Sequence, residues 1–106
     1  PHSINNKIYL YEAKSRYMIL STLGRSLARK HRHGVVVLLF RLLNGPNYIY
    51  VRSYRFNLSE VLKELKSKGL NIGGKDKVFS IMIKDPNYLE HNLSLTLETL
   101  RTKLGI

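Results

Sequence analysis

The sequence predicts one α+β domain spanning residues 1–106, and three observations support this prediction. The chain has 106 residues, of which 43% are hydrophobic, and this is room for a single domain with a core of its own. Short apolar or alternating runs predict strands, and runs with apolar side chains three or four residues apart predict helices. A turn signal rich in Asn, Gly and Pro at residues 44–47 separates two of the strands.

The first half of the chain predicts a strand, a long helix and a hairpin. Residues 7–11 alternate in the manner of a strand. Residues 13–32 carry apolar side chains at helical spacing and end before Gly34, a residue type common just past a helix. Residues 35–43 are so apolar that we expect both faces of this strand to be covered, and residues 48–56 form its hairpin partner.

The hairpin register is predicted from its turn. Closing the hairpin through Gly45 and Pro46 places Arg41 opposite Tyr50 and Leu39 opposite Arg52. A slip of one residue would move every side chain to the other face of the sheet, so the faces depend on this register.

The second half of the chain predicts a short helix, a strand and a final helix. Residues 59–68 form the short helix, residues 71–75 a glycine-containing loop, and residues 78–84 the strand. Pro86 then fits the first turn of the last helix. That helix carries a leucine stripe: Leu89, Leu93, Leu97, Leu100 and Leu104.

The predicted order is therefore β-α-β-β-α-β with an added C-terminal helix. This order resembles the split-βαβ, ferredoxin-like family. The resemblance implies an antiparallel sheet in the strand order 4-1-3-2, with both inner helices on one face.

The net charge favours a polyanionic partner. Eighteen Lys and Arg residues against seven Asp and Glu give a net charge of +11 and a pI near 10.1. Residues 1–55 hold ten of the basic residues and one acidic residue, whereas residues 56–106 hold eight and six. A surplus of this size is typical of proteins that bind DNA or RNA through phosphates, with little sequence specificity.

The candidate phosphate contacts come mainly from the first predicted helix and its C-terminal end. The alternative interpretation of such a stripe is an ordinary solvated helix face, although ordinary faces mix charges of both signs. The candidates on the main surface are Arg25, Arg29, Lys30, Arg32 and Arg55, and those on a second surface are Arg41 and Arg52.

Tyrosines alternate along the strands predicted at 7–11 and 48–56. Tyr48 and Tyr50, with Tyr9 and Tyr11, would share one face of the two central strands of a 4-1-3-2 sheet. This distribution resembles the RNA-recognition-motif family, which implies that the tyrosines stack on bases. The alternative is that the leucine-striped helix covers this face and makes the tyrosines part of the core or of an interface.

Two other function classes remain open. A protein-interaction module could use the apolar hairpin or the leucine stripe, and the stripe could also pair two copies into a homodimer. His31-Arg32-His33 together with Tyr88 resembles the His-hydrophobic-His pair and tyrosine of metal-dependent single-strand nicking enzymes. Because such a site needs a further metal ligand, we expect no enzymatic activity, no metal and no cofactor.

The remaining composition concerns the environment of the protein. The chain has no cysteine, and its longest apolar run is six residues, 35–40, so we expect an intracellular (cytoplasmic) protein without a membrane-spanning segment. The absence of Gln, Cys and Trp resembles small proteins of hyperthermophilic archaea and their viruses.

Overall fold

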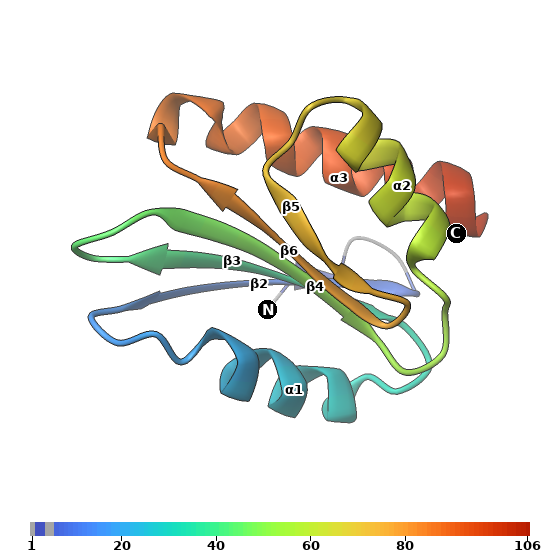
Figure 1. Cartoon of the computed structure of the whole chain (residues 1–106). Coiled ribbons are helices and arrows are strands. Elements are labelled where there is room, and N and C mark those ends of the chain that lie inside the picture. Colours follow the sequence, from blue (N-terminus) through green and yellow to red (C-terminus); the bar gives the residue numbers. More distant parts are fainter. Residues whose placement is uncertain (1, 4–5) are drawn as a thin grey trace.

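The computed structural model describes residues 2–3 and 6–106 and contains six strands, three α-helices and one 3₁₀ turn within them (Figure 1). In chain order they are β1 (His2–Ser3), β2 (Ile8–Ser15), α1 (Leu20–Lys30), β3 (Val35–Leu42), β4 (Asn47–Ser53), α2 (Ser59–Ser67), β5 (Ile72–Lys75), β6 (Val78–Ile83), η1 (Pro86–Tyr88) and α3 (Leu89–Leu104).

The strands form one mixed sheet in the order β1-β2-β3-β4-β6-β5. β2 runs parallel to β3, and the other neighbouring pairs are antiparallel. The α+β class is confirmed, but the ferredoxin-like order 4-1-3-2 is wrong. That order would put residues 35–43 at a sheet edge, whereas residues 35–40 are all buried. A strand this apolar needs a neighbour on each side and cover on both faces, and the central position of β3 provides them.

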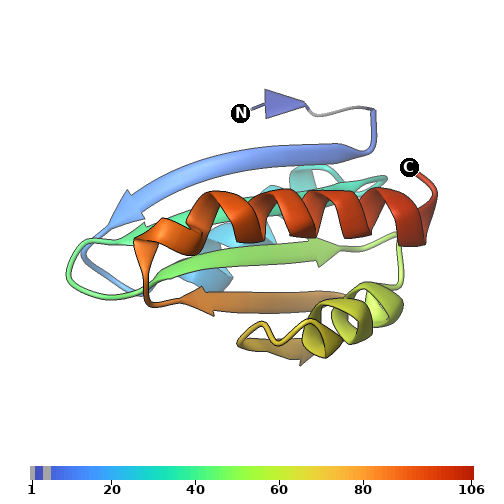
Figure 2. The same ribbon diagram turned by 90° about the horizontal axis from the view of Figure 1, so that it is seen from above.

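The helices lie on both faces of the sheet rather than on one. Figure 1 shows α1 on one face and α2 with α3 on the other. Figure 2 shows α3 over the middle of the sheet and α2 over the edge that contains β5. The expectation that both inner helices share one face is therefore wrong, because the parallel β2–α1–β3 unit and the later α2 unit return to the sheet on opposite sides. We call the two sides the α1 face and the α2/α3 face.

Two predicted elements need correction. Residues 13–15 belong to β2, and α1 begins only at Leu20, so Tyr17 is 74% exposed in the connection between them. The predicted loop at 71–75 contains β5, which pairs with β6 and extends the sheet. The other predicted strands and helices are confirmed to within a few residues.

The hairpin of β3 and β4 has a register three residues away from the prediction. Leu38, not Arg41, lies opposite Tyr50, and Val36 lies opposite Arg52. An odd shift exchanges the faces, so Arg52 lies on the α1 face and Arg41 on the α2/α3 face.

The larger core fills the α2/α3 face. Leu89 and Leu100 are buried, and the other leucines of the stripe pack around the same aliphatic core. Burying a leucine side chain contributes about 1.5–3 kcal/mol, so the stripe holds α3 on its own sheet.

A smaller core lies under α1. It contains Leu20, Leu38, Phe40 and Tyr50. Tyr50 is only 3% exposed because its ring lies beneath Gly24, where a Cβ atom would overlap the ring. Glycine at this position lets the helix approach the sheet closely enough to bury a tyrosine.

Among the residues that the structure describes, no helix has the length and apolar character needed to cross a bilayer.

Candidate nucleic-acid interface

Three arginines meet around the exposed side chain of Tyr54, just beyond β4. The guanidinium carbon of Arg32 lies 5.3 Å from the centroid of the Tyr54 ring, and that of Arg52 lies 5.7 Å away. Arg29, in the last turn of α1, reaches the Tyr54 hydroxyl. We call Arg29, Arg32, Arg52 and Tyr54 the Tyr54 cluster. Cations over an aromatic face are attracted to its negative quadrupole, so the ring holds the guanidiniums together despite their like charge.

The Tyr54 hydroxyl lies in the positive electrostatic field of these arginines. Desolvation raises the pKa of Tyr54, but hydrogen bonding from Arg29 and the positive charge of Arg52 and Arg29 outweigh it, so the pKa lies below its usual value. An oxygen at this point is therefore stabilised as an anion. A phosphate oxygen beside the same guanidiniums would experience the same stabilisation.

Arg52 is anchored from below by the sheet. Its Nη1 donates to the hydroxyl of the buried Tyr50 at 2.9 Å, and this hydrogen bond is the main reason that the pKa of Arg52 is raised. The buried Nε of Arg52 has no hydrogen-bond partner within the described part of the chain. Tyr50 therefore holds the guanidinium in place, and its donor capacity for a ligand lies in the remaining Nη hydrogens, because the buried Nε is out of a ligand's reach.

The segment that carries Tyr54 is fixed to the end of α1 by Ser53. The buried Ser53 hydroxyl donates to the Gly34 carbonyl at 2.8 Å and accepts from the backbone amides of Arg55 and Phe56. Gly34 lies between the turn after α1 and the first residue of β3, so these bonds place Tyr54 beside Arg32. Arg55 lies next along this segment, with its guanidinium 5.4 Å from the Phe56 ring centroid.

Among the residues that the structure describes, no carboxylate forms an ion pair with these cations. Within residues 2–3 and 6–106, the ion pairs join Glu12 to Arg41, and Glu64 to Lys68 and Lys103. None involves the cationic surface, which we define as Arg25, Arg29, Lys30, Arg32, Arg52 and Arg55. The reason is visible in the sequence, because α1 contains no acidic residue. Arg25 lies one helical turn before Arg29, so the surface continues along α1.

Three predicted site residues lie elsewhere. Arg41 is on the opposite face and pairs with Glu12 at 3.3 Å. Tyr50 is buried under Gly24, and Tyr48 is half-buried beside the same core. Helix α1, not the C-terminal helix, covers the tyrosines, so the base-stacking role expected of Tyr50 is wrong.

Tyr54 was not among the predicted site residues. The segment Arg52-Ser53-Tyr54-Arg55, with a tyrosine between two arginines, was the available signal in the sequence.

The two histidines predicted as part of a nicking site are bound to tyrosines instead. His31 stacks on Tyr9 with ring centroids 3.8 Å apart and hydrogen-bonds the Tyr11 hydroxyl, and His33 Nε2 lies 3.0 Å from the Tyr9 hydroxyl. Desolvation, followed by the charges of Lys30 and His33, lowers the pKa of His31. The histidines therefore belong to an aromatic cluster beside β2.

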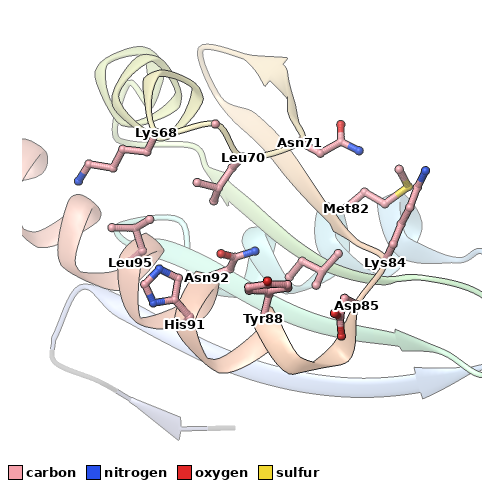
Figure 3. Close-up of a pocket in the computed structure, with 12 residues that line it drawn as sticks. Lys68, Leu70, Asn71, Met82, Lys84, Asp85, Tyr88, His91, Asn92 and Leu95 are labelled. Carbon is pink, nitrogen blue, oxygen red and sulfur yellow. The ribbon is translucent and has the colours of Figure 1, made fainter.

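Tyr88 lies at the start of α3, on the other side of the sheet from these histidines (Figures 1 and 3). Among the described residues, no group of three or more His, Asp or Glu side chains is arranged to hold a metal. The His-X-His pair and the tyrosine of the nicking constellation are not brought together.

The comparisons with known proteins show similarity of fold. No protein-family model and no curated protein matches the chain. The C-Ala domain of Aquifex aeolicus alanyl-tRNA synthetase matches with a TM-score of 0.62 and 18% identity, over 88% of this chain and 89% of that one. RecJ from Thermus thermophilus, solved in complex with Mg²⁺, matches with a TM-score of 0.58 and 14% identity. This second match covers 91% of the present chain but only 15% of RecJ. The chain therefore has the fold of the C-Ala domain and of a small part of RecJ.

Proposed function

We propose that this chain binds nucleic acid through phosphates, using the cationic surface on the α1 face, and that it acts by binding rather than by catalysis. The observation that carries the proposal is the Tyr54 cluster, in which three guanidiniums meet and none is paired with a carboxylate of the described residues. Collecting like charges costs free energy unless an anion offsets it, so the arrangement suits a polyanionic ligand.

The chemistry of the surface favours phosphate contacts over base readout. Guanidinium groups donate in a fork that matches two phosphate oxygens, and each contact releases condensed counterions. Contacts of this kind position a protein on a nucleic acid without reading its sequence. Affinity should therefore depend strongly on salt and weakly on sequence.

The structural neighbours support the same proposal. The C-Ala domain belongs to an enzyme named for its action on a tRNA. The likeness concerns the fold, so the cationic surface of the present chain provides the independent support.

The test removes three charges from one face and compares the result with the same loss from the other face. Arg25→Ala, Arg29→Ala and Arg32→Ala together should weaken binding to every sequence tested. The logarithmic salt slope should fall by about 0.9 per lost phosphate contact on duplex DNA. The matched control is Lys63→Ala, Lys66→Ala and Arg101→Ala, three exposed cations of the α2/α3 face. Fluorescence anisotropy against salt, with duplex and single-stranded DNA and RNA, measures both variants.

Both variants carry the same net charge. Their comparison therefore shows whether binding depends on the cationic surface or only on the net positive charge of the chain. The control should keep the affinity and slope of the unmodified chain. Equal losses in the two variants would contradict the proposed surface. The proposed surface would also be contradicted if both variants bound as tightly as the unmodified chain at low salt. No binding of any nucleic acid near physiological salt would favour the protein-interaction module instead.

A further inference from the structure

A groove of about 550 Å³ opens on the α2/α3 face, where α2 and α3 diverge. Figure 3 shows Lys68, Leu70 and Asn71 along one wall and Tyr88, His91, Asn92 and Leu95 along the other, with Met82 and Lys84 at one end. The volume falls within the range of small-molecule sites, which is about 300–1,000 Å³.

The groove combines apolar side chains with unused polar groups. Leu70, Leu95 and Ile83 line it with hydrocarbon. Within residues 2–3 and 6–106, the side chains of four of its polar residues make no hydrogen bond or ion pair; these are Asn71, Lys84, His91 and Asn92. Polar groups that converge on an apolar groove without partners of their own are available to fix the orientation of a ligand.

Tyr88 gives the groove an aromatic surface. It is 59% exposed, in the η1 turn at the start of α3. The turn is fixed by the Asp85 carboxylate, whose Oδ1 accepts from the backbone amide of Asn87 at 3.0 Å. The turn fixes the backbone of Tyr88, and its exposed ring is accessible to a planar ring that stacks on it in the groove.

The two lysines of the groove differ in what they can offer. The Lys68 ammonium is 3.3 Å from a Glu64 carboxylate oxygen, so its charge is already offset. Lys84 has no acidic partner among the described residues. Lys84 is thus the cation available to an anionic group, while the Asp85 carboxylate nearby can accept from an amino group.

We propose that this groove binds a nucleotide. The base stacks on Tyr88, the amides of Asn71 and Asn92 contact its polar edge, and Lys84 contacts its phosphate. The nucleotide is either a free mononucleotide or the terminal nucleotide of a strand, since both present the same chemistry.

The groove is independent of the cationic surface. Residue 78 of β6 pairs with Arg52 of the Tyr54 cluster, whereas Ile83, which lines the groove, pairs with Asn47 at the other end of β4. Five residues of strand separate the two ends by about 17 Å, and the two sites lie on opposite faces of the sheet. The proposal does not depend on binding at the α1 face.

Calorimetric titration of the whole chain with AMP, adenosine and ribose 5-phosphate tests the groove. AMP should bind more tightly than either fragment, because only AMP has both base and phosphate. Tyr88→Ala should weaken AMP binding by about 5- to 150-fold, the range of base–aromatic stacking energies. Lys84→Ala should weaken AMP binding while leaving adenosine binding unchanged.

The matched control is Tyr17→Ala, which removes another exposed tyrosine at a distance from the groove and should leave AMP binding unchanged. Circular dichroism confirms that each variant is folded. The proposal is overturned if AMP does not bind, if AMP and ribose 5-phosphate bind equally, or if the two tyrosine variants behave alike.

Binding to the variant Arg25→Ala, Arg29→Ala and Arg32→Ala, whose cationic surface is weakened, distinguishes a free nucleotide from the terminal nucleotide of a strand. Tighter binding of a short single strand than of AMP assigns the groove to the end of a strand, and the reverse assigns it to a free nucleotide. If the unmodified chain binds nucleic acid through the α1 face but does not bind AMP, this proposal is wrong and the proposed function is unaffected.

Discussion

The two faces of the sheet carry helices of opposite electrostatic character. Helix α1 contains three basic residues and no acidic one. Helices α2 and α3 together contain four of each, and Glu64 pairs with Lys68 and Lys103. The presence of basic residues alone does not distinguish the faces, since basic residues occur on both. The difference lies in the carboxylates, whose absence from α1 leaves its arginines available to an external anion.

The faces also differ in how they are packed. The α2/α3 face has a broad aliphatic core, to which the leucine stripe of α3 contributes. The α1 face has a smaller core that depends on close approach at Gly24 and on the buried ring of Tyr50. The hydroxyl of Tyr50 in turn anchors Arg52. On the α1 face, the packing of Tyr50 under α1 and the position of Arg52 are therefore coupled.

The largest effect is expected from a substitution that disturbs the contact between α1 and Tyr50. Gly24→Ala adds a methyl group where the Tyr50 ring lies. Overpacking of this kind costs about 1–3 kcal/mol, and the better helix propensity of alanine recovers up to about 1 kcal/mol. Because the overlap involves a buried ring, we expect a net loss of about 2 kcal/mol in the free energy of unfolding, measured by urea denaturation, with weaker nucleic-acid binding.

Gly73→Ala is the control for this prediction. Gly73 lies on the edge strand β5, where an added Cβ meets no atom within 4 Å. We expect a change within about 0.5 kcal/mol. Equal stability of the two variants would show that α1 is not packed as closely as described.

A smaller effect distinguishes a free arginine from a paired one. Arg32→Ala should lower the affinity for nucleic acid uniformly across sequences and reduce the salt slope by about one. Arg41→Ala should change neither, because Arg41 lies on the other face and is paired with Glu12. Fluorescence anisotropy against salt measures both, and a larger loss for Arg41→Ala would refute the assignment of the faces.

Much of the secondary structure could be predicted from local pattern, whereas the sheet order could not. The unbroken apolar run at 35–40 identifies β3, and the spacing of the leucine stripe identifies α3. The pairing of β2 with β3 joins segments that are distant in the sequence. The apolar character of residues 35–40, which are buried on both faces, was the only local sign of this pairing. The end of β2 was missed because Ala13 and Tyr17 also fit a helical spacing.

The site could be predicted in part, for a similar reason. A surplus of arginine without carboxylates is readable in the sequence, and it predicts Arg29 and Arg32 as candidate phosphate contacts. Placing Arg52 with them and Arg41 apart requires the register of the hairpin, which the turn residues did not determine. Tyr54 was missed because its role depends on Ser53, whose hydroxyl ties this segment to Gly34.

The most direct test of the α1 face is chemical-shift mapping of the backbone amides of the isotope-labelled chain during titration with a short blunt-ended duplex. We predict that the largest shifts occur at Arg29, Arg32 and Tyr54, that they saturate together, and that added salt reverses them. Largest shifts within α2 or α3, with the Tyr54 cluster unchanged, would contradict it.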